Sequence, residues 1–572
     1  MRYVQKRLLR SAVLAASFWL LTAADDPGVE ARLRVAETQE SQILSVLHHL
    51  TDIYGPRLTG SPQLKGAQDW SAETMRAWGL ENVHLEPWAF GRAGWSNQLT
   101  EVSVIAPYQS PVLARVLPWT PSTGGLLVAN AVILAPPGMP PAGRSSQRST
   151  EAKAAALAAP GALPMPPKAE APPLPTQGEL ASYLESMKDK VRGAIVLVGP
   201  PASPQPDFLP KPLRWTDAEW DALLNAPPSA APGMSRRPEA ASIRLTPFQI
   251  HAQIAKFLAE NGALVRVKDA GEARGLIRVE STNGYGEIPQ VPAITIANAD
   301  YGRIARTLQR GVPVTLRVNL QNRTHPEGRT SYNVIGEIPG TDKRDEIVML
   351  GAHLDGWATA TGATDDAAGA AVMMEAMRLL KKIGVRPRRT IRIALWGGEE
   401  QGIYGSQAYV AQHFGSFEQP KPAFGKLSAY INLDNGTGRP RAATYFGPQS
   451  GASIIAEKLA GFRDWGFRGA NTASFRPVSD AAAFYGAGLP SIGLYQDPFD
   501  YISQLHHTNF DTFEEVYEPD VRIAAIEIAA LANALAMDEK MMPRFDVSTI
   551  PSRDPREGPR ARVRPPENHG EP

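Results

Sequence analysis

The chain has 572 residues, with 59 lysine and arginine residues against 58 aspartate and glutamate residues, and it contains no cysteine. A formal net charge of +1 lacks the basic excess of nucleic-acid-binding proteins, so nucleic acid is not an expected partner. The absence of cysteine excludes disulfide bonds, thiolate zinc sites, iron–sulfur clusters and a cysteine nucleophile. Any bound metal must therefore take histidine and carboxylate ligands.

The first 24 residues have the pattern of a secretory signal peptide. Four basic residues precede an apolar run at 12–23 that ends in small residues, and we expect cleavage near Ala23 or Ala24. An N-terminal membrane anchor is the alternative, but the run is shorter than the roughly 20 residues that a spanning helix needs. No later segment is apolar enough to span a membrane. We therefore expect an exported protein, periplasmic or extracellular, with no stable membrane span after cleavage.

The N-terminal part of the mature chain is predicted to be helical from Val29 to Trp78, with a strand at 82–90 that bends at Pro87. Residues 135–176 are dominated by Ala, Pro and Met, a composition that predicts a mobile loop. The segments around this loop resemble a small separate module, with strands at 193–200 and 263–269, a helix at 248–262 and a further structured segment at 291–311.

Beyond Tyr332 apolar strands alternate with amphipathic helices, which predicts an α/β fold with a mostly parallel central sheet covered by helices on both faces. We expect a catalytic domain formed by 25–105 and 325–542, an insert at 106–324 and a disordered tail at 543–572. The predicted strands are 347–351, 390–396, 427–433 and 489–495, and the predicted helices are 367–382, 404–413 and about 519–537.

Acidic and imidazole side chains follow three successive strands of this predicted sheet. His353 and Asp355 come directly after the first strand, Glu399 and Glu400 after the second, and Asp434 after the third. Open α/β sheets bind their ligands at these carboxyl ends. Taken singly, such residues are usually ordinary core or surface residues, but their joint occurrence at strand ends predicts a common site. Two further groups complete it, namely Asp365 in the small-residue segment GATDDAAG and the pair His506 and His507.

A metal ion is needed to bring these groups together. Several carboxylates in one crevice repel one another strongly unless cations lie between them. Imidazole and carboxylate ligands without thiolate suit Zn²⁺ first, with Mn²⁺ or Co²⁺ also possible. Three ligating carboxylates, Asp365, Glu400 and Asp434, together with a bridging hydroxide would balance the charge of two Zn²⁺ ions, so we expect two Zn²⁺ per chain.

The run from Gly351 to Ser406, together with AYINLD and LHHTNFDT, resembles the co-catalytic di-zinc exopeptidases of metallopeptidase family twenty-eight. Within that family it is most similar to the carboxypeptidase Q branch and its bacterial relatives, as is the segment LTDIYGPRLTGSPQLKGAQDW at 50–70. The resemblance covers about residues 30–540. The insert resembles a protease-associated domain, although its strand motifs are generic.

The resemblance implies a role for each site residue. His353 and Asp434 would bind one zinc ion, Glu400 and His507 the other, and Asp365 would bridge them. Glu399 would be the general base, Asp355 the carboxylate partner of His353, and His506 would take the place of a tyrosine that stabilises the oxyanion. An exchange of roles between His506 and His507 remains open. For Asp366 helix capping is preferred over metal ligation.

The implied activity is hydrolysis of short peptides by a metal-bridging hydroxide, with Glu399 taking the proton. We expect an exopeptidase; the choice between aminopeptidase, dipeptidase and carboxypeptidase, the side-chain preference and the oligomeric state stay open. Two alternatives share the fold, namely a non-catalytic receptor or scaffold and a single-zinc acyltransferase resembling glutaminyl cyclases. A scaffold would be expected to have lost ligands, whereas this sequence fills every ligand position and that of the base.

Overall fold

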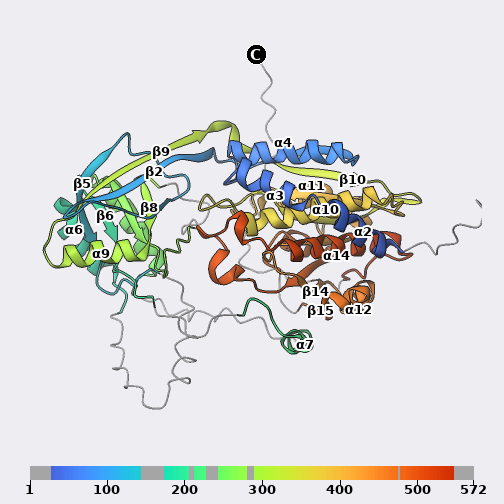
Figure 1. Cartoon of the computed structure of the whole chain (residues 1–572). Coiled ribbons are helices and arrows are strands. Elements are labelled where there is room, and N and C mark those ends of the chain that lie inside the picture. The colour runs from blue at the N-terminus through green and yellow to red at the C-terminus, as the bar shows by residue number, and fades with distance from the viewer. Residues whose placement is uncertain are drawn as a thin grey trace, which may run out of the picture.

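The structure, a computed structural model, describes residues 28–142, 173–204, 212–226, 243–279, 289–473, 477–546 and 550. Its strands form two eight-stranded sheets, which lie apart and are connected by the long strands β2 and β9 (Figure 1). The predicted signal peptide lies outside the described residues, as do most of the low-complexity segment 135–176 and most of the tail 543–572.

The first sheet has the strand order β1-β10-β12-β11-β13-β16-β14-β15. At its centre β12, β11, β13 and β16 run parallel to one another. Antiparallel pairing adds β10 and β1 on one side and β14 on the other, so the sheet as a whole is mixed. Its strands are β1 (Glu81–Ala89), β10 (Thr330–Ile338), β11 (Lys343–His353), β12 (Arg389–Trp396), β13 (Leu427–Asn432), β14 (Pro440–Phe446), β15 (Gly469–Thr472) and β16 (Ser491–Gln496).

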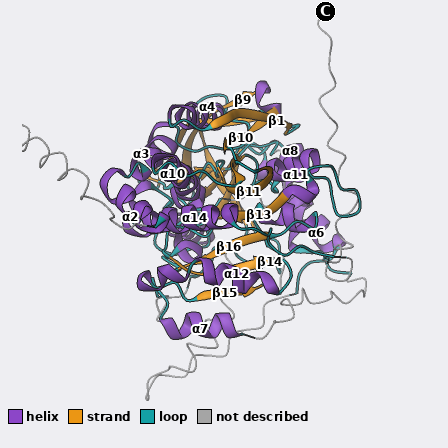
Figure 2. Ribbon diagram, turned by 90° about the vertical axis from the view of Figure 1, so that its right-hand side faces the viewer, coloured by secondary structure: helices purple, strands orange, loops and turns teal. Residues whose placement is uncertain are grey.

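Helices cover both faces of the first sheet (Figure 2), which confirms the predicted α/β fold. In β12, Ile393 and Leu395 pack into one apolar cluster, whereas Ala394 and Trp396 pack into another on the opposite face. Burial on both faces explains why these strands read as continuous apolar runs. The first cluster includes α2 (Val29–Glu40), α3 (Ile43–His48), α4 (Pro62–Ala77), α10 (Ala368–Lys382), α12 (Ser450–Lys458) and α14 (Glu518–Met537), and the second α11 (Tyr404–His413) and α13 (Ala481–Gly486).

The second sheet has the order β3-β2-β9-β5-β6-β7-β8-β4, with β5, β6, β7 and β8 parallel. The chain enters this sheet at Gly94, ahead of the boundary expected at 106, because β2 pairs with β9 from Gly94 onward. The division into domains and the protease-associated character of the insert stay predictions. The elements are β2 (Gly94–Ala106), β3 (Ser110–Pro111), β4 (Ala114–Val116), β5 (Leu127–Leu134), β6 (Ile195–Val198), β7 (Val265–Asp269), β8 (Ala293–Ile296), β9 (Thr315–His325), α6 (Gln177–Val191), α8 (Pro247–Glu260) and α9 (Asn298–Gln309).

One short helix, α7 (Asp217–Asn225), lies far from its sequence neighbours of the second sheet. It packs beside β14 and β15 of the first sheet in both views (Figures 1 and 2). The indole of Trp220 donates to Asp497, and the guanidinium of Arg441 donates to Asp217. The sequence pattern did not predict this contact, because α7 and its partners are separated by more than 200 residues. In the part of the chain that the structure describes, no helix is long and apolar enough to cross a membrane.

Candidate metal centre

The three predicted strand ends lie side by side. β11 pairs with β12 on one side and with β13 on the other, and all three run in the same direction. His353 is the last residue of β11, Glu399 and Glu400 follow β12, and Asp434 follows β13. The parallel centre of the sheet therefore brings these side chains to one edge, as the sequence predicted.

The orientation of His353 leaves one ring nitrogen for a metal. Its Nδ1 lies 2.9 Å from the main-chain oxygen of Asp355, which can only accept a hydrogen bond. Nδ1 therefore carries the proton, and Nε2 presents its lone pair toward Asp365 Oδ1 at 3.3 Å and Asp434 Oδ1 at 3.7 Å. The carboxylate of Asp355, which was the expected partner of this ring, is too far away for a hydrogen bond, since its Oδ1 lies 3.7 Å from Nδ1.

The carboxylate of Asp355 instead supports the turn that follows β12. It accepts hydrogen bonds from the main-chain amides of Glu399 at 3.1 Å and Glu400 at 3.3 Å, and from the hydroxyl of Thr59 at 2.9 Å. Asp355 is fully buried. It therefore fixes the backbone from which both glutamates extend, while its main-chain oxygen fixes the tautomer of His353.

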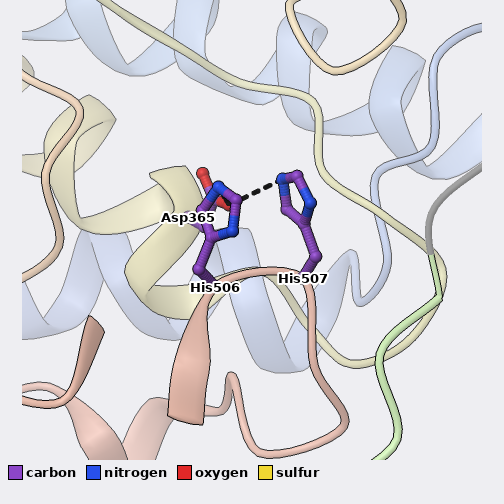
Figure 3. A group of neighbouring side chains, drawn as sticks. All are labelled: Asp365, His506 and His507. Carbon is purple, nitrogen blue, oxygen red and sulfur yellow. Dashed lines mark ion pairs between the residues drawn. The ribbon is translucent and has the colours of Figure 1, made fainter. Parts of the chain in front are cut away.

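Asp365 lies between two groups of candidate ligands. Its Oδ1 faces His353, and its Oδ2 lies 3.2 Å from Nε2 of His507 and 3.7 Å from Nε2 of His506 (Figure 3). His507 Nε2 also lies 2.9 Å from Glu400 Oε2. One group thus contains His353, Asp365 and Asp434, and the other Asp365, Glu400 and His507.

The segment GATDDAAG places Asp365 in a short π-helical segment, Ala363–Ala367, directly ahead of α10. The next residue, Asp366, accepts a hydrogen bond from the amide of Gly369 at 3.1 Å, as expected for helix capping. A Cβ atom at Gly369 would lie 2.2 Å from Asp366 Oδ1, so this close approach requires glycine.

The two histidines of the last loop are stacked, with ring centroids 3.6 Å apart. Both can join Asp365 in a group whose ligand atoms lie within 4.8 Å of one another. His507 is the closer to Asp365 and also contacts Glu400, which favours it as a ligand. Burial lowers the pKa of His506 to about 4, so its ring is neutral at neutral pH and keeps one N–H donor.

These residues fit a metal ion. His353 Nε2 and Glu400 Oε1 are shielded from solvent and make no hydrogen bond within the described part of the chain. Such orphaned groups cost free energy unless a partner satisfies them. Two imidazoles and three carboxylates converge without a cationic side chain between them in the described contacts. This donor set matches Zn²⁺ and is compatible with a second ion that shares Asp365.

Glu399 precedes the candidate ligand Glu400 in the turn after β12, and the pKa of its carboxyl is strongly shifted. Burial raises the pKa of its carboxyl well above the usual range; Asp434 and Asp480 act in the same direction, whereas His353 opposes them. A carboxyl group with a raised pKa in a crevice has the character of a general base or acid.

Sequence reasoning missed two residues at this site. The guanidinium of Arg57 is fully buried and donates to main-chain oxygens of five residues, at 2.5–3.2 Å. It thereby joins the segment after β11 to the segment that carries Asp365. Arg57 lies in the segment 50–70 that resembles the family, but the sequence could not reveal which distant oxygens its side chain binds. The five acceptors are Leu50, Gly55, Leu354, Thr361 and Gly362.

The second missed residue is Tyr501, whose hydroxyl lies 3.3 Å from Asp434 Oδ1.

A small hollow opens beside the second ligand group. A segment after β11 lines one side, and the candidate ligands with the loop after His506 line the other. The lining residues are Trp357, Thr359, Ala360, Gly362, Asp365, Glu400, His507, Thr508 and Asp511.

The segment that carries every candidate site residue matches a known family. Residues 333–532 match the model described as Peptidase family M28. Carboxypeptidase Q from Rattus norvegicus is 30% identical over 259 residues, which cover 45% of this chain and 52% of that protein. The match thus spans about half the length of these curated relatives.

Two solved structures share the fold. The Peptidase M28 precursor from Shewanella amazonensis has a TM-score of 0.58 at 22% identity, with 91% of this chain and 100% of that chain covered. BSAP, a zinc aminopeptidase from Bacillus subtilis, has a TM-score of 0.51 at 18% identity, with 88% and 97% covered. Residues 333–532 thus match the family that the motifs predicted, and these structures confirm the α/β fold.

Proposed function

From this family match and the geometry of the site, we propose that the protein is a zinc-dependent exopeptidase that hydrolyses short peptides. The observation that carries the proposal is the pair of ligand groups that share Asp365 at the carboxyl ends of parallel strands. We propose two Zn²⁺ per chain, with Mn²⁺ or Co²⁺ as possible replacements.

Each candidate ligand has a place in this proposal. His353 and Asp434 would hold one ion, Glu400 and His507 the other, and Asp365 both. When bound, the ions supply Lewis acidity toward the scissile carbonyl and lower the pKa of a water molecule. The side chains must keep this arrangement rigid, which Arg57 and Asp355 support through their contacts with the segments after β11 and β12.

Glu399 is the proposed general base. It would take the proton of the attacking water and give it to the leaving amine. Cations bound nearby would lower the raised pKa of this carboxyl, and that would bring the group toward the range in which it exchanges protons at neutral pH. His506, which is neutral and beside His507, would donate a hydrogen bond to the oxygen of the scissile carbonyl as negative charge develops there.

The site also favours cleavage at a chain terminus. Carboxylate oxygens at its rim can accept hydrogen bonds from the α-ammonium group of a peptide. A terminus bound there would place the first peptide bond over the reacting groups and no later one. We further propose that residues 1–24 direct export, so that the mature enzyme acts in the periplasm or outside the cell.

The test combines metal analysis with product analysis on the purified mature chain. We expect two equivalents of zinc by elemental analysis, loss of peptide hydrolysis in chelator and recovery with Zn²⁺. Full activity of verified metal-free protein would refute the proposal. Pyroglutamate formation with a single zinc ion would indicate the acyltransferase alternative, and metal-loaded protein inactive on a peptide library would indicate a scaffold.

A further inference from the structure

A connection of the second sheet reaches the candidate metal centre. Residues 276–279 lie between β7 and β8 and pair with the segment after His506. The amide of Asn509 donates to the oxygen of Ile277 at 3.0 Å, and the amide of Val279 donates to the oxygen of His507 at 3.3 Å. Arg278 and Thr508 therefore face each other in an antiparallel bridge.

The pairing fixes the side of this connection on which Arg278 lies. Ile277 and Val279, which are 0% and 3% exposed, pack into an apolar cluster with Leu117 and Ala293. Successive side chains of an extended segment point to opposite sides, so Arg278 points away from that cluster. Residues that face each other across antiparallel strands share a side. Arg278 thus lies on the side of Thr508.

The hollow of the proposed active site lies on that same side. Thr508 lines it together with Asp365, Glu400 and His507. Two guanidinium nitrogens of Arg278, Nε and Nη1, are shielded from solvent. The positive charge of Arg278 is also close enough to His506 to lower the pKa of that ring, in addition to the larger effect of burial. A second cation near the site, Arg57, donates to five main-chain oxygens.

We propose that Arg278 is a specificity-determining residue that binds a carboxylate of the peptide substrate. This inference rests on the proposed exopeptidase function and names the substrate class of the same site. A guanidinium binds a carboxylate through two parallel hydrogen bonds, and it does so best where water is partly excluded. The carboxylate has two possible sources, the C-terminus of a short peptide or an acidic side chain after the scissile bond.

The C-terminal carboxylate of a dipeptide is the source to which the geometry points. A peptide advances about 3.5 Å per residue, so the C-terminus of a dipeptide lies only one residue beyond the bond that is cut. Arg278 lies opposite Thr508, the immediate neighbour of the candidate ligand His507. We therefore expect a preference for dipeptides with a free C-terminus.

The experiment compares Ala-Ala, Ala-Ala amide, Ala-Glu amide and Ala-Gln amide as substrates. For the wild type we expect kcat/KM on Ala-Ala to exceed that on its amide by at least about 10-fold, a ratio typical of one charge-assisted contact. Arg278→Gln should lose this preference through a higher KM on Ala-Ala, with little change on the amide. Arg278→Lys should recover part of it. Arg274→Gln, which alters an exposed arginine of the same connection, is the matched control and should keep it.

The outcomes separate the possibilities. A preference for Ala-Glu amide over Ala-Gln amide that Arg278→Gln abolishes would support carboxylate binding and assign it to the side chain. Equal losses of Arg278→Gln on acid and amide, or no loss on either, would refute the role of Arg278.

Binding without turnover distinguishes this inference from the proposed function. In the zinc-loaded Glu399→Gln protein, titration calorimetry should show Ala-Ala binding at least about 10-fold more weakly once Arg278→Gln is added. If the wild type cleaves no peptide while this difference persists, peptide hydrolysis is wrong and the carboxylate site stands. If peptides are cleaved and the difference is absent, Arg278 is not the carboxylate site. Unchanged zinc content and melting temperature in each variant exclude misfolding.

Discussion

The substitution Asp355→Asn tests whether the carboxylate of Asp355 supports the glutamate turn or the imidazole of His353. The carboxylate accepts from the amides of Glu399 and Glu400 and from the hydroxyl of Thr59. An asparagine side chain offers one oxygen and one NH₂ group, so at least one main-chain amide loses its acceptor. The carbonyl of residue 355, which receives the Nδ1 proton of His353, is unchanged.

The magnitude follows from these contacts. A buried amide without a partner costs about 1–3 kcal/mol, and the remaining bonds lose their charge assistance, which is worth roughly 1 kcal/mol. Removal of one buried negative charge among other carboxylates offsets part of this loss. We expect the metal-free protein to be destabilised by about 1–3 kcal/mol. A shift of the turn by about 1 Å would lower kcat on the order of 10²-fold.

Three measurements check this prediction, namely urea unfolding in chelator, zinc content and kcat on a dipeptide. We expect lower stability and lower kcat with zinc retained. Thr59→Val is the matched control, because it removes the third donor and leaves both amide bonds intact; its kcat should remain close to that of the wild type. Loss of zinc at unchanged stability would show instead that the carboxylate acts on His353.

Three further predictions address the chemistry, the substrate and the pH dependence of stability. Glu399→Gln should keep both metal ions and lower kcat at least about 10²-fold, whereas Glu400→Gln should also lose metal; equal metal content and equal residual rates would contradict the separate roles. Dipeptides and tetrapeptides with acetylated N-termini should be cleaved far more slowly than free ones, and internal cuts in a long peptide would contradict terminal anchoring. Burial raises the pKa of Glu37 to about 8, with Glu375 adding to the effect. Because the folded state then binds more protons than the unfolded state, this carboxyl stabilises the protein below about pH 4.5 and loses that contribution as pH rises toward 8. Urea midpoints of Glu37→Gln should therefore fall less between pH 5 and pH 8 than those of the wild type, and parallel pH profiles would contradict the assignment.

The sequence was sufficient to predict the parallel centre of the first sheet and the residues at its edge. The reason is local: apolar strands, intervening helices and polar residues at strand ends form a pattern that can be read along the chain, and the direction of parallel strands then gathers those residues. The sequence did not predict which atom of Asp355 contacts His353, because a main-chain oxygen has no sequence pattern. Nor did it predict the contact of Ile277 with Asn509, which joins residues 232 positions apart.

In the proposed function, the metal chemistry and the substrate preference depend on different parts of the chain. All candidate metal ligands lie within 333–532, the segment that matches the peptidase family. Residues of the second sheet and its connections contact Thr359, which lines the hollow. Arg115 donates to the main-chain oxygen of Thr359 at 2.8 Å, and the hydroxyl of Thr359 donates to the oxygen of Val279 at 3.3 Å. Arg278 belongs to this second set and lies outside the family match. Similarity over 333–532 therefore informs the metal chemistry, whereas the proposed carboxylate contact depends on a residue that this segment does not include.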